Sequence, residues 1–344
     1  MVDRNRPARR LKIPSRVNLD NPTLGALCAI SIGLSVAGCS ETTVTDVPAG
    51  RLRTTTLTLP PLLVPAHTAA MVGPASGRAL DFGNGDIYVH RFRASTRNLA
   101  TDEVDRQFVC HAHLGPVVQG PACCTKDLCP DLAVSKSFSA IQGTSGITLP
   151  EGFAVVYNSN QSLGITGMAL NNNPRGEDQK VRYEIDIDYW EARDAKNLPI
   201  QPLEVLWVPL VPARSQPVDT LSMHWIVPPG THVYNSDPET QKLFDILPDR
   251  ARVHFIAIHL HAFGEWVELH DLTTGQTIWR GQAVTDSDLR YIRHIDHYSS
   301  TEGLILYHDH EYEIRTGYSN PLSESIDAMA TMRMFYRAET EKTL

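Results

Sequence analysis

The sequence predicts an all-β protein that folds as two antiparallel sandwiches. Apolar and polar residues alternate in several short runs, and 23 prolines with 22 glycines leave little room for long helices. That pattern alone also allows one large sandwich. Two are favoured because a proline-rich run at 198–217 divides a chain that is long enough for two ordinary domains. We therefore expect an N-terminal sandwich over 51–196 and a C-terminal sandwich over 199–338.

Three stretches carry the strand pattern most clearly. Residues 53–59 are rich in β-branched side chains and end at two prolines. Residues 181–189 alternate apolar with charged side chains, which is typical of a half-buried strand. Residues 265–272 and 277–279 flank a Thr-Thr-Gly-Gln segment, so they predict a hairpin.

The N-terminus predicts export. A basic region at 4–16 precedes an apolar run at 24–38, which ends in small residues directly before Cys39. These features make 1–38 a secretory signal, and the run is too short to span a membrane comfortably. Cysteine after Ala-Gly resembles a bacterial lipobox, so we expect a lipid on Cys39, an anchored linker over 39–50, and an outer-membrane or cell-surface lipoprotein. The alternative is a plain cleavable signal with an unmodified Cys39.

Charge and cysteine content fit an exported protein. The net charge is −8 and the signal contributes +4, so the mature part carries −12, which argues against nucleic acid and anionic lipid as partners. Beyond the signal and Cys39, four cysteines remain: Cys110, Cys123, Cys124 and Cys129. An even number in an oxidising compartment predicts two disulfides, with the pairing open except that strain disfavours a Cys123–Cys124 bridge. Binding of a soft metal by this cluster is the alternative.

Residues 253–261 predict a strand with two histidines on one face. Side chains alternate across a strand, so His259 and His261 point the same way. Two imidazoles on one face can chelate a transition-metal ion, and a thioether as third ligand would select copper, because soft sulfur suits Cu(I). The alternative is a pair of ordinary core or surface histidines.

Two segments together resemble the type II, ascorbate-dependent copper monooxygenases, the family of peptidylglycine α-hydroxylating monooxygenase and dopamine β-monooxygenase. They are residues 259–269, with the pattern His-x-His-x-x-Gly, and residues 327–336, which contain Met329. The resemblance is best over 220–337. It implies two jelly-roll domains facing across a solvent cleft, with His259, His261 and Met329 as ligands of an oxygen-binding copper. It also implies ascorbate as reductant and hydroxylation of a C–H bond.

The same resemblance implies a second, electron-supplying copper held by three histidines of the N-terminal domain. His111 and His113 are the candidates, with hydrogen-bonded loop or core histidines as the alternative. The position of the third ligand holds Asn171, and an amide is a poor copper ligand; His90 could substitute. The sequence therefore leaves one or two coppers open.

The substrate positions depart from the peptide-hydroxylating branch. The residues that match its carboxylate anchors are Ala257, Thr331 and Arg333. Thr331 and Arg333 share a strand face with Met329, so we expect them to bind substrate, with a surface ion pair as the alternative for Arg333. We expect a small organic substrate other than a C-terminal glycine.

A second pair, His308 and His310, repeats the one-residue spacing and could bind metal or simply lie at a polar strand edge. Three functions thus stand side by side. The chain is a lipid-anchored copper monooxygenase, a copper-binding lipoprotein without turnover, or a non-metal jelly-roll module that binds a glycan or a protein. Fold alone cannot separate them.

Overall fold

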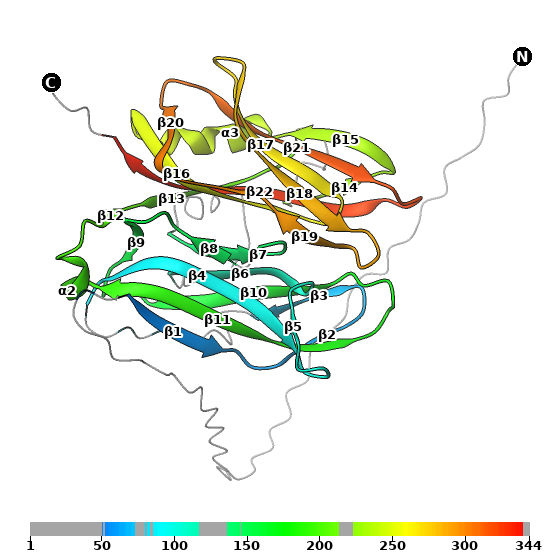
Figure 1. The fold of residues 1–344 in the computed structure, drawn as a ribbon. Coiled ribbons are helices and arrows are strands. Elements are labelled where there is room, and N and C mark those ends of the chain that lie inside the picture. The colour runs from blue at the N-terminus through cyan, green and yellow to red at the C-terminus, as the bar shows by residue number, and fades with distance from the viewer. Residues whose placement is uncertain are drawn as a thin grey trace, which may run out of the picture. The chain divides into compact units, whose positions relative to one another are not determined.

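The computed structural model describes residues 50, 52–72, 80, 82, 85–116, 136–144, 146–212 and 223–339. These residues belong to one compact unit, Ser40–Leu344. The all-β prediction is confirmed, because the described residues fold into sheets that are antiparallel except at one short pair of strands and that form two jelly-roll sandwiches (Figure 1). In the described ranges, no helix is long and apolar enough to cross a membrane.

Strands of the first sandwich run from Arg53 to Pro202. An eight-stranded sheet in the order β1-β11-β4-β9-β12, with β2, β5 and β8 at its sides, packs on a four-stranded sheet in the order β3-β10-β6-β7. The elements are β1 (Arg53–Thr58), β2 (Leu62–Val64), β3 (Thr68–Val72), β4 (Ile87–Asn98), β5 (Val104–Asp105), β6 (Val109–Pro116), β7 (Phe138–Ile141), β8 (Gly146–Thr148), β9 (Phe153–Tyr157), β10 (Leu163–Asn171), β11 (Gln179–Glu191), α2 (Ala192–Ala195) and β12 (Gln201–Pro202).

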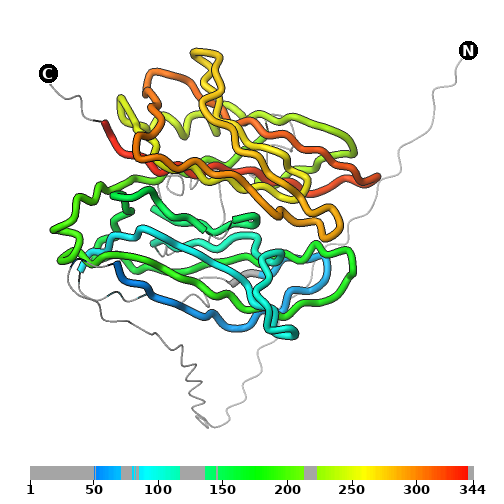
Figure 2. Tube along the Cα trace, viewed as in Figure 1, coloured from blue at the N-terminus to red at the C-terminus, as the bar shows by residue number. Residues whose placement is uncertain are grey.

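The second sandwich pairs two five-stranded sheets. One has the order β13-β22-β16-β20 with β14 also on β22, and the other has the order β15-β21-β17-β18-β19. The elements are β13 (Glu204–Pro209), β14 (His224–Val227), β15 (Gly230–Asn235), α3 (Pro238–Gln241), η1 (Lys242–Ile246), β16 (Arg250–Leu260), β17 (Gly264–Asp271), β18 (Gln276–Asp286), β19 (Tyr291–Ile295), β20 (His297–Tyr307), β21 (Tyr312–Asn320) and β22 (Ile326–Ala338). Leu203 alone separates β12 from β13, where the chain passes between sandwiches (Figure 2).

The predicted strand patterns form the expected elements. In β11, Val181, Tyr183 and Ile185 are fully buried while the charged residues between them are not. Strands β17 and β18 form the predicted hairpin. Its turn contains Gly275 at φ +71°, a conformation that favours glycine.

Strands β16 and β22 are covered on both faces. Ile256 and Ile258 join the core of the second sandwich, whereas Phe255, Ala257 and Phe335 join the hydrophobic cluster of the first. The ring of Phe335 lies 5.4 Å from that of Phe138, centroid to centroid. Residues of the two sandwiches therefore touch directly here, whereas the family resemblance implied two domains facing across solvent.

Several predicted features lie outside the described residues. They are the signal 1–38, the lipidation site Cys39 with nearly all of the linker 39–50, and the three cysteines Cys123, Cys124 and Cys129.

Candidate metal centre

His259 and His261 lie at the end of β16, on the face turned toward the first sandwich. They are 5% and 6% exposed, and their ring centroids are 5.3 Å apart. The strand ends here because Phe263 takes a left-handed φ of 70° and Gly264 N–H donates to the His261 carbonyl at 3.1 Å. A Cβ at Gly264 would lie 3.0 Å from the Leu260 side chain and 3.1 Å from the His261 carbonyl oxygen, so a side chain here would crowd the tight turn after the histidines.

Met329, Thr331 and Arg333 occupy the neighbouring strand β22. His259 pairs with Thr331, and His261 N–H donates to the Met329 carbonyl at 3.3 Å. Directly opposite residues of antiparallel strands share a face, so all three side chains lie on the face of the two histidines. Each is 7% exposed. The structure thus brings together, on one buried sheet face, the residues that the sequence proposed for metal and substrate.

Tyr318 fixes the spacing of these strands. Its buried hydroxyl donates to the Met329 carbonyl at 2.7 Å and accepts from the N–H groups of His261 and Met329 at 3.2 and 3.3 Å. Burial raises its pKa far above the usual value, so it stays a neutral donor and acceptor. The Tyr318 hydroxyl therefore links the backbone of His261 to that of Met329.

Cys110 of the first sandwich reaches the same place through a β-bulge. Strand β6 advances two residues, from Val109 to His111, while β10 advances one, so Cys110 is the extra residue. A bulge re-aims a side chain, and the Cys110 sulfur lies 4.0 Å from His261 Nε2. Cys110 is a free thiol, 2% exposed, and burial raises its pKa to about 12. The sequence had grouped Cys110 with the disulfide candidates.

A carboxylate orients His261. Asp327 Oδ2 accepts from His261 Nδ1 at 2.8 Å and lies 3.0 Å from His224 Nδ1. Burial alone would raise the pKa of Asp327, but these hydrogen bonds outweigh it and hold the pKa well below its usual range. Because an ionised carboxylate only accepts, Nδ1 of His261 carries the proton of this hydrogen bond, and Nε2 is the nitrogen that faces the Cys110 sulfur. The hydrogen bond to Asp327 also raises the pKa of His224.

Within the described part of the chain, His259 has no hydrogen-bond partner for either ring nitrogen. Both Nδ1 and Nε2 are buried without a hydrogen bond. One of its nitrogens, a nitrogen of His261 and the Cys110 sulfur all lie within 4.8 Å of one another. Burial lowers the pKa of His259 well below its usual value, and His261 acts in the same direction, so the ring is neutral and keeps a lone pair for a metal.

His111 and His113 join this cluster from the first sandwich. Their ring centroids are 4.5 Å apart, and that of His111 is 6.1 Å from that of His259. Ala112 between them faces the core. His113 Nδ1 bonds with the Ser139 hydroxyl, whereas His111 Nδ1 is buried and unpaired. Burial lowers the pKa of His111 to about 4. These two histidines therefore adjoin the His259 cluster instead of forming a site at a distance from it.

The candidate third ligands of the N-terminal site have structural roles. The Asn171 amide donates to the carbonyls of Val64 and Glu177 at 3.2 and 2.9 Å, which closes the turn after β10. His90 bonds with the Phe153 carbonyl at 3.1 Å and packs on Trp190. The Asn171 amide is therefore used by a turn, and the contacts of His90 are with Phe153 and Trp190, not with His111 or His113.

Arg333 is a buried cation beside the histidines. Its Nε has no hydrogen-bond partner in the described ranges, and burial lowers its pKa to about 10, so it remains charged at neutral pH. Burial mainly lowers the pKa of His111 and of His259, and the charge of Arg333 adds to this. The alternative of an exposed ion pair does not hold, since Arg333 is 7% exposed.

The other histidine pair is tied into the fold. His308 Nδ1 bonds with the Leu247 carbonyl at 2.9 Å, and His310 Nδ1 bonds with Asp271 at 2.7 Å. Their Nδ1 atoms have protein partners, unlike that of His259, so this pair is a control for the candidate site.

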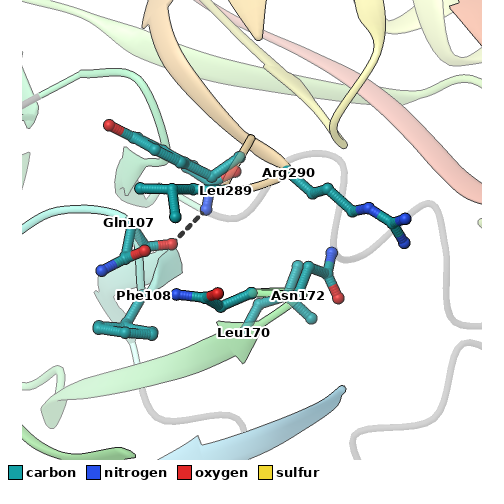
Figure 3. A pocket seen from close by; sticks show the side chains of 9 residues that line it. Gln107, Phe108, Leu170, Asn172, Leu289 and Arg290 are labelled. Carbon is teal, nitrogen blue, oxygen red and sulfur yellow. Dashed lines mark hydrogen bonds between the residues drawn. The ribbon is translucent and has the colours of Figure 1, made fainter. Parts of the chain in front are cut away.

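A small pocket lies elsewhere between the sandwiches (Figure 3). The space between its lining residues does not admit even a water-sized molecule, so it is no cavity for a ligand. Across it, the Gln142 amide donates to the Gln107 carbonyl at 2.6 Å. The lining residues are Gln107, Phe108, Gln142, Leu170, Asn172, Asn173, Leu289, Arg290 and Tyr291. None of the metal-ligand candidates lines it, so we give it no role.

Sequence reasoning missed three members of this site. Asp327 had a usable signal, because it stands two residues before Met329 on the same strand face. His224 and Cys110 had no comparable signal in the sequence. His224 enters through pairing of β14 with β22, and Cys110 enters through a bulge that breaks the alternation.

No protein-family model matches the chain, and no curated protein matches it. Among solved structures, the STIV MCP shares 12% identity over 83% of this chain and 97% of that chain, with a TM-score of 0.35. The major capsid protein P2 from bacteriophage PM2 shares 9% identity over 88% of this chain and 97% of its own, with a TM-score of 0.30. PNGF-II shares 10% identity over 90% of this chain and 63% of its own, with a TM-score of 0.29. These likenesses concern the fold alone and assign no function to the chain.

Proposed function

We propose that the protein binds one copper ion between its two sandwiches, with His259 and His261 as imidazole ligands and Met329 as a thioether beside them. The observation that carries the proposal is the state of His259. The residue is 5% exposed and neither ring nitrogen has a partner among the residues that the structure describes, although other histidines lie against the ring.

The energetics support a ligand at this position. A buried polar group without a hydrogen bond costs about 1–3 kcal/mol, and His259 has two such groups. A metal ion would use one lone pair and turn part of that cost into binding energy. The His261 ring is already oriented by Asp327, as the imidazole ligands of metals commonly are.

The donor set supports copper over harder ions. Imidazole nitrogens combined with sulfur suit copper or zinc, whereas Mg²⁺ and Ca²⁺ require oxygen ligands. The buried charge of Arg333 adds repulsion that a monovalent ion feels less than a divalent one. Cu(I) meets both conditions. Ascorbate, proposed from the family resemblance, is a reductant that would maintain it.

The site favours copper binding without coupled hydroxylation. His111 and His113 lie against the His259 cluster, and Asn171 is used by a turn. Two separate coppers, one for each sandwich, are therefore not part of the proposal. Hydroxylation of a small organic substrate stays a prediction from the family resemblance, as do export and the lipid on Cys39.

The test is a Cu(I) titration against a chromophoric chelator. We expect one site per chain in the wild type and its loss in His259→Ala. The matched control is His308→Ala, which removes a histidine of the same spacing whose Nδ1 bonds with a backbone carbonyl. Binding that is equal in the wild type and in His259→Ala would refute the proposal, whereas a loss in both variants would point to general destabilisation.

A further inference from the structure

We infer that Cys110 is a thiolate ligand of the same copper, so that the site is a His₂Cys set shared by the two sandwiches. This inference rests on the proposed copper binding and deepens it. It adds a ligand that the first sandwich supplies, and it assigns the site a class of chemistry, one-electron transfer.

The distances fit a common ion. Ligand atoms about 2.3 Å (sulfur) and about 2.0 Å (nitrogen) from one tetrahedral metal lie about 3.5 Å apart. The Cys110 sulfur is 4.0 Å from His261 Nε2, and a His259 nitrogen lies within 4.8 Å of both. Contraction by about 0.5 Å along the first distance would bring the sulfur and nitrogen to the separation expected for two ligands of one metal.

The bulge in β6 supports a role of Cys110 as a metal ligand. A small buried cysteine is often only a core residue, and by alternation Cys110 would join Ala112 in the core of the first sandwich. It does not belong to that hydrophobic cluster, because the extra residue in β6 re-aims it toward His261. Bulges disrupt a strand pair locally and are over-represented at functional sites.

The state of the His259 ring independently supports a ligand at this position. His259 is 95% buried, its ring nitrogens have no partner among the described residues, and one of them lies within 4.8 Å of the Cys110 and His261 donor atoms. A cysteine on its own would carry no site. Here the thiol completes a group that contains an imidazole without a hydrogen bond in the described part of the chain.

Met329 would be the fourth, weak donor. Its backbone is bonded to that of His261, and its side chain lies on the same sheet face. Two histidines and a cysteine with a distant methionine are the ligand set of copper sites that transfer single electrons. Such a set occupies the positions that an oxygen-activating site must keep open.

Copper uptake and reduction at this site would transfer one proton and one electron. On uptake of Cu(II), the Cys110 thiol gives its proton to the solvent, so one H⁺ is released for each sulfur–metal bond formed. Reduction then consumes one electron from an enediol such as ascorbate, which is left as its one-electron oxidised radical. In this step no bond between the chain and a substrate forms or breaks.

The test is the visible and electron paramagnetic resonance spectrum of the purified wild-type protein, loaded with Cu(I) and oxidised anaerobically with ferricyanide. We expect an intense thiolate-to-copper charge-transfer band and a narrow copper hyperfine splitting. Cys110→Ser should lose the band yet still bind copper through the histidines. Its Cu(I) affinity should fall by more than the about 10–100-fold typical of removing a residue that only supports a ligand. His308→Ala should keep the band.

The outcomes separate the two proposals. A wild-type protein that binds one copper without the charge-transfer band would overturn the role of Cys110 and leave the proposed function standing. A wild-type protein that binds no copper would overturn both. If Cys110→Ser does not fold, the wild-type spectrum decides alone, since the band requires a copper–thiolate bond.

Discussion

Replacing His259 with leucine should stabilise the metal-free protein, which is unusual for a buried polar residue in a strand. His259 is 5% exposed and both ring nitrogens lack partners. Each buried, unsatisfied group costs about 1–3 kcal/mol, so removing two recovers about 2–6 kcal/mol. Imperfect packing of the new side chain costs about 1–3 kcal/mol. We therefore expect a net gain of about 2 kcal/mol in the free energy of unfolding without metal.

His254 on the same strand provides the matched control. It is fully buried, but its Nδ1 bonds with the Ser300 carbonyl at 3.0 Å and its Nε2 accepts from Arg337 Nε at 3.3 Å. His254→Leu leaves those two groups unpaired at about 1–3 kcal/mol each, so it should destabilise the protein by about 2–6 kcal/mol.

The assay is urea unfolding in a chelating buffer, where a changed midpoint at an unchanged slope reports stability. We expect the free energy of unfolding to rise in His259→Leu and to fall in His254→Leu. If His259→Leu lowers the midpoint as much as His254→Leu does, the ring nitrogens of His259 are satisfied in solution. The main support for a metal at this position would then be lost.

Three further predictions concern the carboxylate beside His261, the N-terminal cysteine and one ion pair of the first sandwich. Asp327→Asn should lower Cu(I) affinity about 10–100-fold in the chelator titration, because His261 loses the carboxylate that orients it; an unchanged affinity would contradict that role. Cys39→Ala should abolish lipid modification, so the protein should leave the detergent phase on phase separation, and its retention there would remove the lipobox interpretation. The hydrogen bond from Arg97 lowers the pKa of Glu184, so its contribution to stability is present above the ordinary glutamate pKa of about 4.3 and is lost as the pH falls further. Glu184→Gln should flatten urea stability against pH in that acidic range, and an unchanged slope would show that the pair is too weakly coupled.

The fold could be read from the sequence wherever period-two alternation was unbroken. Residues 181–189 and the β17–β18 hairpin are strands with the expected burial. The same rule placed His259 and His261 on one face, and Thr331 and Arg333 beside Met329. These assignments needed only strand geometry, which a sequence expresses locally.

The composition of the site could not be read in that way. Alternation assigns Cys110 to the core of the first sandwich, and only the bulge in β6 sends it toward His261. The family resemblance separated His111 and His113 from His259, whereas direct packing of the two sandwiches brings them together. Contacts between distant strands depend on tertiary packing, and nothing in the local pattern encodes them.

The central claim is one copper per chain at a site that both sandwiches build. The most direct measurement is the metal content of the purified protein after anaerobic loading with Cu(I) and removal of excess ion, determined by elemental analysis against protein concentration. The account predicts one copper per wild-type chain and none in a His259→Ala, His261→Ala double variant. Two coppers per wild-type chain, or none, would contradict it.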